Sequence, residues 1–415
     1  MKYFIKIVYN CFTFFIEKIL FLFAGLSPKV KQFYEGQKAI KSFKEKIIVW
    51  RNENSNKKII WFHCASLGEF EQGRPVIESF KKSNPEFGIL LTFFSPSGYE
   101  IRKNYALVDF VSYLPIDSVK SAKSFVEAVN PTFAVFVKYE FWPNIIKALK
   151  KQKTTIIGIS VILRENQAFF KPWGQYFKDI LFSFDHLFVQ NSKTAKLLEK
   201  INYKNYSIVG DTRFDRVSDL ANNIKEVHGI KEFMDGKKVF VVGSAWKEDM
   251  EVLIPFIEKH EDLKFIIAPH EMHESEMNEW MQKIDAQKYS EYLKDTSRKS
   301  QILIIDSIGL LSQLYQYATF AYVGGSFGKG LHNTLEAAVF GVPIFFGDKN
   351  FKKFQEAVDL IEIGVAFPIS NLTSLNTSFE MIDNEKLKAI KSKSFEYVRN
   401  QSGATSQILK YLAKS

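Results

Sequence analysis

The sequence predicts an α/β protein with two doubly wound parallel sheets. Short runs rich in β-branched and aromatic residues alternate with polar stretches long enough for helices, from about Lys57 to Gly210 and again from Val239 onward. A polar stretch with paired asparagines and two glycines separates the two runs. Such alternation is typical of parallel sheets with helices on both faces. We therefore expect two domains of this kind.

The expected elements fall into three segments. Residues 1–26 form a membrane-associated helix, residues 27–215 the first domain and residues 216–415 the second. Strands of the first domain are expected at Ile59–Ala65, Ile89–Phe94, Val108–Leu114, Phe133–Val137, Thr155–Ser160, His186–Gln190 and Ser207–Gly210. Strands of the second are expected at Val239–Gly243, Lys264–Ala268, Gln301–Ile305, Thr319–Val323, Pro343–Phe346 and Val365–Pro368. Ligands of such sheets bind at the carboxyl ends of the strands, so we expect the active site in the cleft between the domains.

Length and composition agree with two globular domains. A chain of 415 residues exceeds what one hydrophobic core usually supports, and 46% hydrophobic with 25% charged residues excludes a disordered chain. The net charge of +10 comes from scattered lysines without any nucleic-acid-binding motif, so we expect anionic ligands or an anionic membrane surface and no nucleic acid. Cys11 and Cys64 support neither a disulfide framework nor a zinc site, which favours a reducing, cytoplasmic compartment.

The first 26 residues are mostly apolar but carry a narrow polar stripe. At helical spacing, this stripe contains Lys2, Lys6, Asn10, Thr13 and Glu17. A secretory signal would need a shorter unbroken apolar core, and a spanning helix would not carry a charge pair near its middle without a partner. We expect a helix in the membrane interface, with a spanning helix or a helix packed on its own protein as alternatives. Six lysines between residues 29 and 46 can face anionic lipid heads on the cytoplasmic side.

The sequence matches several familiar motifs only in part, because residues that each motif requires are absent. Gly328-Lys329 lacks the earlier glycine and the following Ser or Thr of a Walker phosphate loop. No Gly-x-Gly-x-x-Gly follows the first strand, which removes the main support for a nicotinamide or flavin enzyme. His270 and His273 do not have the spacing of zinc peptidases, and no Gly-x-Ser-x-Gly elbow occurs. We expect no metal.

Three features remain as candidates for chemistry. Ser66 and Glu69 match a helix capping box, which pattern alone favours, but a carboxylate after the first strand also stands where a general base acts. Glu140 follows another strand, where its ordinary role is to face a helix dipole. His332 and Glu336 lie one turn apart on an expected helix after a glycine-rich strand end. They are either a surface pair or part of a nucleotide site.

Six segments taken together resemble a known family. They are Ala65–Glu69, Tyr139–Asn144, Gly210–Asp215, Gly324–Ser326, His332–Glu336 and Asn350–Phe351. Their order and spacing are similar to those of the 3-deoxy-D-manno-octulosonic acid (Kdo) transferases of lipopolysaccharide synthesis. The resemblance implies a GT-B glycosyltransferase with two Rossmann-like domains. It also implies an inverting enzyme that moves Kdo from CMP-Kdo to a hydroxyl of a lipid A precursor, at the cytoplasmic face of the inner membrane.

The resemblance assigns catalytic roles to three residues. The family's general base falls on Glu69, which would take a proton from the acceptor hydroxyl as its oxygen attacks the anomeric carbon. Arg213 stands in place of a family lysine that helps to stabilise the transition state, although arginine presents a fixed fork. Glu140 matches the second acidic residue of a Glu-x-Glu-x-Trp-Pro motif, whose first position is Lys138 here.

The same resemblance implies a CMP-binding second domain with no cofactor. Its donor-binding positions are Pro269, His270, Ile308, Gly309, Leu310, Ser326, Asn333, Thr334, Leu335 and Glu336. Glu336 would accept hydrogen bonds from ribose hydroxyls, and residues 308–310 would offer backbone groups to the nucleotide. His270 stands where the family has an arginine, and its ordinary pKa is about 6.5. We expect donor affinity to weaken as pH rises through the pKa of this histidine.

Two alternative functions stay open at this point. Another GT-B enzyme, a UDP-sugar transferase or epimerase, would bind UDP rather than CMP. A non-enzymatic membrane scaffold with the same fold would bind no nucleotide. An epimerase would also have no use for an apolar N-terminus.

Overall fold

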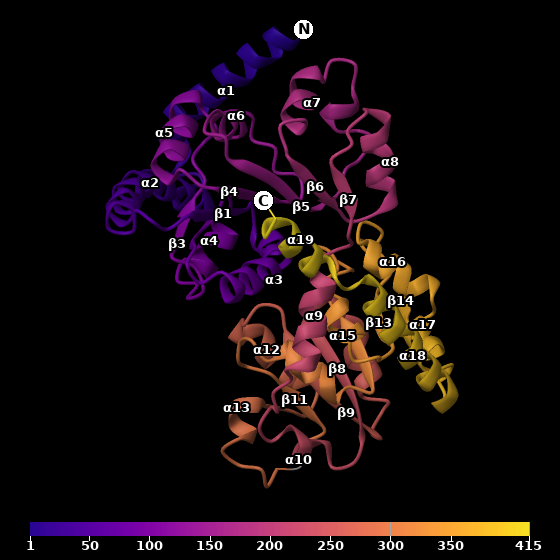
Figure 1. Ribbon diagram of the computed structural model, residues 1–415. Coiled ribbons are helices and arrows are strands. Elements are labelled where there is room, and N and C mark those ends of the chain that lie inside the picture. The colour runs from indigo at the N-terminus through magenta and orange to yellow at the C-terminus, as the bar shows by residue number, and fades with distance from the viewer. Residues whose placement is uncertain (299, 415) are drawn as a thin grey trace. The chain divides into compact units, whose positions relative to one another are not determined.

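The computed structural model describes residues 1–298 and 300–414, and it divides into two compact units (Figure 1). Unit 1 comprises Met1–Asp215 together with the last residues from Ser402 onward, and unit 2 comprises Arg216–Gln401. The division after Asp215 falls inside helix α9 (Arg213–Asn222). Each unit contains one seven-stranded sheet with parallel pairing, so both are α/β domains of the expected class.

The sheet of unit 1 has the strand order β3-β2-β1-β4-β5-β6-β7. Its strands are β1 (Ile59–Cys64), β2 (Gly88–Phe93), β3 (Phe110–Tyr113), β4 (Phe133–Val137), β5 (Thr155–Val161), β6 (His186–Val189) and β7 (Tyr206–Ile208). Its helices after α1 (Lys2–Phe23) are α2 (Pro28–Glu53), α3 (Leu67–Ser83), α4 (Pro96–Arg102), α5 (Val119–Val129), α6 (Pro143–Lys151), α7 (Gln175–Leu181) and α8 (Ser192–Lys200), with a short 3-10 turn at Ala168–Phe170. From β1 the chain adds β2 and β3 on one side of the sheet, and from β4 it adds β5, β6 and β7 on the other side, as in a doubly wound sheet.

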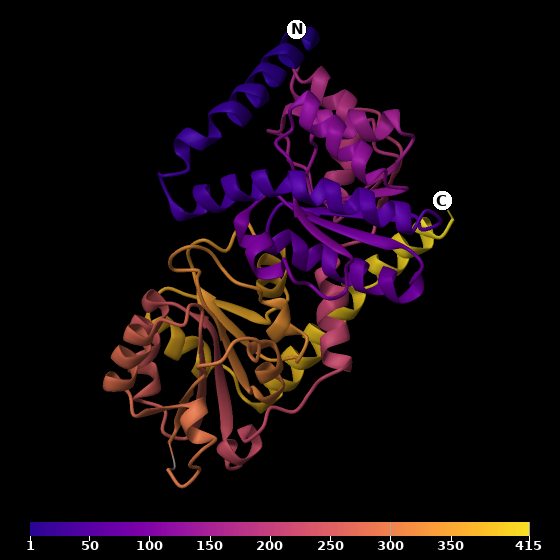
Figure 2. The same ribbon diagram turned by 90° about the vertical axis from the view of Figure 1, so that its left-hand side faces the viewer.

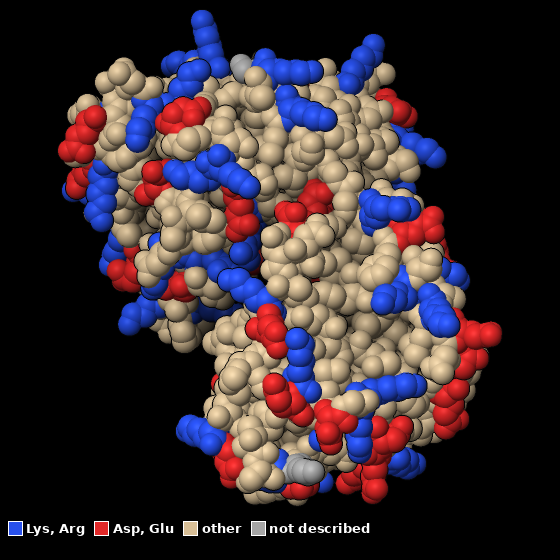
Figure 3. Space-filling view, turned by 60° about the horizontal axis from the view of Figure 1, so that its bottom comes forward, with Lys and Arg blue, Asp and Glu red and all other residues tan. Residues whose placement is uncertain are grey.

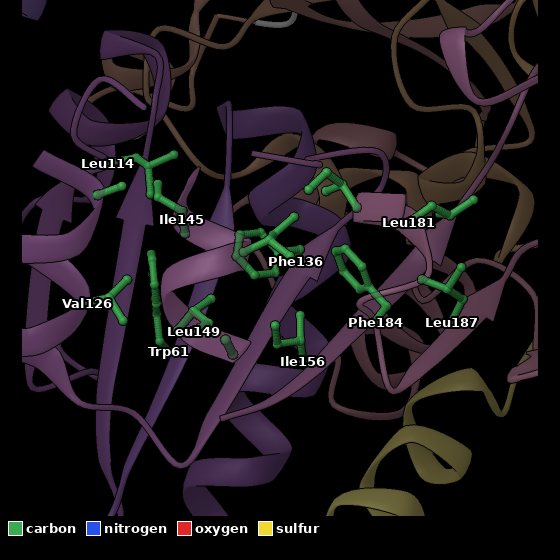
Figure 4. Packing of buried hydrophobic residues seen from close by; sticks show 14 of the residues in the cluster. Trp61, Leu114, Val126, Phe136, Ile145, Leu149, Ile156, Leu181, Phe184 and Leu187 are labelled. Atoms are coloured by element: carbon green, nitrogen blue, oxygen red, sulfur yellow. The ribbon is translucent and has the colours of Figure 1, made fainter. Parts of the chain in front are cut away.

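Alternating side chains of the central strands of unit 1 enter two separate cores. On β1, Ile59 and Trp61 pack into the core that includes α5 and α6, whereas Ile60 and Phe62 pack into the core on the opposite face. Figure 4 shows the first core around Trp61 and Phe136. Successive side chains of a strand point to opposite faces, so a strand covered by helices on both sides must be apolar throughout. This is why the strands read as continuous hydrophobic runs in the sequence.

The sheet of unit 2 has the strand order β10-β11-β9-β8-β12-β13-β14. Its strands are β8 (Lys238–Ala245), β9 (Leu263–Pro269), β10 (Ala286–Lys288), β11 (Ile302–Ile304), β12 (Phe320–Val323), β13 (Ile344–Gly347) and β14 (Ala366–Ile369). Its helices after α9 are α10 (Ile230–Met234), α11 (Lys247–Ile257), α12 (Glu274–Lys283), α13 (Tyr289–Tyr292), α14 (Leu311–Leu314), α15 (Leu335–Ala338), α16 (Gln355–Glu362), α17 (Leu372–Glu380) and α18 (Asn384–Gln401), with a 3-10 turn at Tyr315–Tyr317. Every expected strand range overlaps a strand of the structure. Strand β10 was not expected, because its three residues Ala-Gln-Lys carry no hydrophobic pattern.

Helix α19 (Ala404–Leu412) belongs to unit 1, which corrects the expectation that residues 216–415 form a single domain. Its Ala404, Ile408 and Leu412 are buried in the same core as one face of β1. Both carboxylate oxygens of Asp215 accept backbone N–H groups from the first residues of this helix. The apolar stripe of α19 therefore finds its partner on the first sheet, and a reading along the chain could not reveal which sheet it covers.

Helix α1 turns its polar stripe toward unit 1 and its apolar side outward. Thr13 is only 7% exposed, whereas Phe4 and Phe12 are 69% and 61% exposed. The Ser121 hydroxyl of α5 donates to Oε1 of Glu17 at 2.6 Å. Figure 2 shows α1 and α2 as successive helices joined by a sharp turn. Within residues 1–298 and 300–414, no helix is apolar enough over sufficient length to cross a bilayer.

Surface charges of both signs are interspersed. Over the face drawn in Figure 3, Lys and Arg side chains lie among Asp and Glu side chains. Exposed ion pairs such as Lys150–Asp185 and Lys283–Glu279, each with 2.8 Å between nitrogen and oxygen, are of the kind that stabilises a fold only slightly.

Substitution Ile408→Ala tests the assignment of α19 to unit 1. Ile408 is fully buried, and removing its side chain from a packed core costs about 2–5 kcal/mol. In denaturant unfolding followed by hydrogen exchange, we expect the strands of unit 1 to lose protection while β8 and β9 keep theirs. The exposed Gln407→Ala on the same helix is the matched control and should change neither. Loss of protection confined to unit 2 would contradict the assignment.

Candidate functional site

In unit 1, a capping box holds Glu69 at the turn after β1. Ser66, in extended conformation with φ −141°, is the N-cap residue of α3. Its backbone N–H donates to Oε2 of Glu69 at 2.8 Å, and its hydroxyl donates to the same oxygen at 3.1 Å. In the described part of the chain, Oε1 of Glu69 accepts no hydrogen bond. One oxygen is therefore fixed while the other can receive a proton.

The surroundings of Glu69 strengthen it as a base. The residue is only 7% exposed. Burial raises the pKa of Glu69, and the carboxylate of Glu140 raises it further, while Lys138 and the hydrogen bonds from Ser66 act in the opposite direction. A raised pKa means that the carboxylate binds a proton more tightly, which is what general base catalysis requires.

Glu140 is held at the exit of β4. Lys138 adopts a left-handed backbone conformation, with φ 66°, directly after this strand. The indole N–H of Trp142 donates to Oε2 of Glu140 at 2.9 Å. Nε2 of the buried His63 lies 3.6 Å from the same oxygen, and its Nδ1 lies 2.9 Å from the hydroxyl of Thr92. The side chain of Glu140 is thus fixed from two sides, next to the candidate base.

The side chain of Arg213 is held by Asp211, which is itself hydrogen-bonded to α3, the helix that carries Glu69. Its Nε and Nη2 donate to Oδ2 of Asp211 at 3.0 and 2.8 Å, and its backbone N–H donates to Oδ1 at 2.9 Å. The buried Gln72 of α3 donates to Oδ2 of Asp211 at 2.8 Å. Burial alone would raise the pKa of Asp211, but the charge of Arg213 and these hydrogen bonds hold it below its ordinary value. Unit 1 therefore holds a permanent cation rigidly at the first residue of α9.

In unit 2, the buried carboxylate of Asp249 ties two strand ends to a helix. The backbone N–H groups of Trp246 and Gly325 donate to Oδ2 at 3.0 and 2.9 Å, and the Tyr322 hydroxyl donates to Oδ1 at 2.8 Å. A Cβ atom at Gly324 would lie 2.2 Å from the carbonyl oxygen of Ser244, so only glycine allows β12 to pass β8 this closely. Both oxygens of Asp249 are occupied, and its role here is structural.

Three aromatic rings stack beside this glycine-rich turn. The ring of His270 lies 4.5 Å from that of Trp246 and 4.1 Å from that of His332, measured between centroids, with interplanar angles of 27° and 29°. The indole N–H of Trp246 donates to Nε2 of His332 at 3.0 Å. Nζ of Lys329 lies over the Trp246 ring, 4.0 Å from its centroid, in a cation–π contact. The stack joins segments that follow β8, β9 and β12.

The two histidines of the stack are held neutral. Burial, together with a smaller contribution from His270, lowers the pKa of His332 to about 4. Burial also lowers the pKa of His270; Glu271 opposes this shift and Lys329 adds to it. Near neutral pH the positive charge of this cluster therefore belongs to Lys329 and not to His270. Because the pKa of His270 lies below the ordinary histidine value of about 6.5, we expect donor affinity to change with pH only below that value.

The helix expected to carry His332, Asn333 and Glu336 begins later than predicted. Helix α15 starts at Leu335, so His332 and Asn333 lie in the preceding turn. Nδ2 of Asn333 donates to Oε1 of Glu336 at 3.2 Å, and Nη2 of Arg216 lies 3.7 Å from the same oxygen. Glu336 is therefore oriented by Asn333 and Arg216, and not by His332.

The glycine-rich turn explains this late start. The N–H of Gly330 donates to the carbonyl of Gly325 at 2.8 Å, and the N–H of His332 donates to the carbonyl of Gly324 at 3.2 Å. These bonds close a loop back onto β12 and leave residues 330–333 outside helical geometry. Gly330 has φ 136°, which a residue with a side chain rarely adopts.

Among the buried hydroxyl groups of the described residues that lack a hydrogen-bond partner, two belong to the predicted donor segments. They are Oγ of Ser326 and Oγ1 of Thr334, and both residues are fully buried. Leaving a buried hydroxyl unsatisfied costs free energy, and such groups often mark a site that a ligand completes. Both lie in the segments that sequence reasoning assigned to the donor.

The other predicted donor residues lie at strand and helix ends of unit 2. Pro269 ends β9, and the N–H of His270 donates to the carbonyl of Ala245 at 3.0 Å. Ile308, which is 90% exposed, precedes Gly309 and Leu310 at the start of α14. Gly309 has φ 94°, which turns the chain into the helix. An exposed apolar side chain beside free helix-start groups suits a bound ligand.

Sequence reasoning missed Trp246 and Asp249. A usable signal existed for Asp249, because an acidic residue three positions after the first residue beyond a strand matches the second half of a capping box. The stacking of Trp246 on His270 had no signal, since the two residues are far apart in sequence. His273 pairs with Glu271 at 2.8 Å and not with His270, and in the described ranges no cluster of His, Cys, Asp or Glu side chains is arranged to hold a metal.

Comparison with known proteins relates this arrangement to a family. A family model described as 3-Deoxy-D-manno-octulosonic-acid transferase (kdotransferase) matches residues 41–216, which include Glu69, Glu140 and Arg213. The 3-deoxy-D-manno-octulosonic acid transferase of Rickettsia bellii is 24% identical over 395 residues, covering 91% of this chain and 93% of its own. That of Aquifex aeolicus is 27% identical over 348 residues, covering 82% of this chain and 90% of its own. The chain belongs to the Kdo transferase family. It is accordingly a glycosyltransferase.

Solved structures similar to this Kdo transferase family member share its architecture. The UDP-GlcNAc 2-epimerase of Neisseria meningitidis matches with a TM-score of 0.61 at 14% identity, covering 86% of this chain and 100% of its own. MurG of Acinetobacter baumannii matches with a TM-score of 0.56 at 12% identity, also covering 86% and 100%. At such low identity the likeness shows the fold alone, two parallel-sheet α/β domains of the GT-B kind.

Substitutions at Lys329 and Glu271 test the electrostatics of the stack. Lys329→Met removes a positive charge and should raise the pKa of His270, whereas Glu271→Gln removes a negative charge and should lower it. NMR titration of the imidazole C–H resonances measures both shifts. Lys283→Met, which removes a lysine paired with Glu279, is the control and should leave His270 unchanged. Shifts in the reverse directions would contradict the assignment of charge to Lys329.

Proposed function

We propose that this glycosyltransferase moves Kdo from CMP-Kdo to a hydroxyl group of a lipid A precursor, releases CMP and inverts the anomeric centre. Membership of the Kdo transferase family supports Kdo transfer itself. The observation that carries the proposed mechanism is the half-satisfied, buried carboxylate of Glu69. A single base is sufficient for direct displacement, which proceeds without a covalent intermediate.

In the proposed reaction, Oε1 of Glu69 takes the proton of the acceptor hydroxyl. The oxygen forms a bond to the anomeric carbon from the face opposite CMP, and the bond from that carbon to the phosphate oxygen breaks, with its electron pair leaving on CMP. CMP is stable as an anion, so cations and backbone donors near the phosphate matter more than a catalytic acid. Arg213 supplies a permanent positive charge held by Asp211. Glu140 keeps the pKa of Glu69 raised.

We assign the nucleotide to the glycine-rich end of β12 and its neighbours in unit 2. The unpartnered hydroxyls of Ser326 and Thr334 can donate to phosphate or sugar oxygens. Glu336, oriented by Asn333, can accept from ribose hydroxyls. Lys329 supplies the charge that neutral His270 does not. These groups account for CMP binding without a metal or cofactor.

We further propose that α1 lies in the interface of the inner membrane, on its cytoplasmic face. The outward side of α1 exposes Phe4, Phe12, Phe15 and Leu22 by 61% to 69%. Exposed apolar side chains in such number mark a surface that another apolar phase covers. The lysines of α2 follow directly, which suits anionic lipid heads rather than a protein partner or nucleic acid.

Substitution Glu69→Gln tests the base. Glutamine at this position still accepts the N–H of Ser66, so the capping box and the fold should persist, but it cannot take a proton. General base catalysis contributes about 10²–10⁴-fold, so we expect kcat to fall by about that factor. Ser66→Ala, which weakens the cap and keeps the base, should cost far less activity. Equal losses in the two variants would indicate that Glu69 acts only as a cap.

Thermal shift with CMP against UDP tests the nucleotide, and mass spectrometry of the product from CMP-Kdo and lipid A precursor tests the whole reaction. We expect protection by CMP and a mass increase of one or more Kdo units. Protection by UDP alone would favour another GT-B enzyme. Protection by neither nucleotide would favour a scaffold.

Substitution of two outward phenylalanines tests the membrane surface. Burying one phenylalanine side chain contributes about 1.5–3 kcal/mol, so Phe12→Ser with Phe15→Ser should weaken binding to vesicles of anionic phospholipid by at least about tenfold. The control Phe395→Ser changes a half-exposed phenylalanine of α18 and should bind vesicles as the parent protein does. Sedimentation with vesicles measures both. Unchanged binding of the double variant would exclude this face of α1 as the membrane surface.

A further inference from the structure

Helix α1 contacts Asp117 and the first turn of α6, the helix that follows Glu140, and does so through polar side chains. The hydroxyl of Tyr9 donates to Oδ2 of Asp117 at 2.7 Å. Nδ2 of Asn144 donates to Oδ1 of Asn10 at 3.0 Å and to the carbonyl oxygen of Asp117 at 2.7 Å. Asn144 is the second residue of α6, four positions after Glu140. The bonds of Tyr9 and Asn10 each link residues more than a hundred positions apart in the chain.

Asp117 joins α1 to the first turn of α6. Its carboxylate accepts the N–H groups of Asn144 and Ile145 at 2.9 and 2.8 Å, in addition to the hydroxyl of Tyr9. The residue is 1% exposed. It satisfies N–H groups at a helix N-terminus that no helical carbonyl can reach, and an anion there is favoured by the helix dipole.

The charge of Asp117 depends on Tyr9. Burial raises the pKa of Asp117 to about 6, and the hydrogen bonds from Asn144, Tyr9 and Ile145 limit that rise. Without the Tyr9 hydroxyl, the carboxylic acid form gains population near neutral pH. A protonated Asp117 accepts backbone N–H groups less strongly, so the first turn of α6 would lose part of its anchor.

The start of α6 in turn fixes Glu140. Trp142 is the N-cap residue of α6, and its indole donates to the Glu140 carboxylate at 2.9 Å. Glu140 lies close enough to Glu69 to raise its pKa. Hydrogen bonds therefore connect α1 through Asp117 to the first turn of α6, and the backbone of residues 142–144 connects that turn to the Trp142–Glu140 bond beside the candidate base.

We propose that Tyr9 and Asn10 of α1 are positioning residues for Glu140, so that the helix expected at the membrane also sets the geometry of the catalytic segment. This inference rests on the proposed function for its kinetic readout. Its physical content is that displacement of α1 loosens residues 139–146. A helix that served only as an anchor would not need buried polar contacts with this segment, since its outward apolar face is sufficient for anchoring.

Variants Tyr9→Phe and Asn10→Ala test the coupling with acceptor dispersed in detergent, where membrane binding is not required. At a temperature well below the unfolding midpoint of every variant, we expect kcat to fall about tenfold with an unchanged KM for CMP-Kdo. The acidic limb of the kcat–pH profile should move to lower pH, because a displaced Glu140 no longer raises the pKa of Glu69. The variant Glu140→Gln should show the same movement. Tyr206→Phe, which removes a hydroxyl that donates to the exposed Glu199 at 2.6 Å and does not touch residues 139–146, is the matched control and should keep kcat and the limb. If Tyr9→Phe and Asn10→Ala behave like this control, the proposal is wrong.

Hydrogen exchange separates failure of this inference from failure of the proposed function. In both variants we expect faster exchange at backbone amides of residues 139–146, with unchanged exchange in β8. This measurement needs no substrate, so it stands even if the parent protein transfers no Kdo. Parent-like exchange over residues 139–146 would overturn the coupling whatever the enzyme's substrate.

Discussion

Buried carboxylates that accept backbone N–H groups where a strand passes into a helix organise both units. Glu69 does this after β1 and Asp249 after β8, each three residues beyond the N-cap. The difference between them lies in the remaining oxygen. Asp249 takes a further N–H from Gly325 and a hydroxyl from Tyr322, so both its oxygens are occupied. Glu69 has one oxygen engaged, and the same local device thus yields a structural anchor in one unit and a candidate base in the other.

Much of the fold could be predicted because its strands are buried on both faces. Continuous apolar runs between polar stretches therefore marked nearly all of the strands. Strand β10 was not predicted because a three-residue strand at the edge of a sheet can form without a run of hydrophobic residues. The position of α19 on the first sheet was also not predicted, because an apolar stripe indicates that one side of a helix is buried but not which sheet covers it.

The candidate site was predictable where its chemistry is local and not where it depends on distant contacts. The capping box of Glu69 could be recognised by spacing alone, but its raised pKa depends on burial and on Glu140, which arrives from another strand. The helix expected at His332 starts later because the glycine-rich turn uses the neighbouring backbone groups to close on itself. The neutral state of His270 depends on its stacking between two rings, and no sequence spacing encodes that.

Helix α19 has a consequence for how the protein is made. Its residues complete a core whose other members lie in the first half of the chain, and all of unit 2 is synthesised between them. Until Ile408 and its neighbours leave the ribosome, α3 alone covers its part of this face, and the apolar side chains that α19 covers stay exposed to water. Unit 2 has no such dependence, because its residues are contiguous. Synthesis from the N-terminus thus reverses the usual order of folding, so that the domain begun first is the last to be completed.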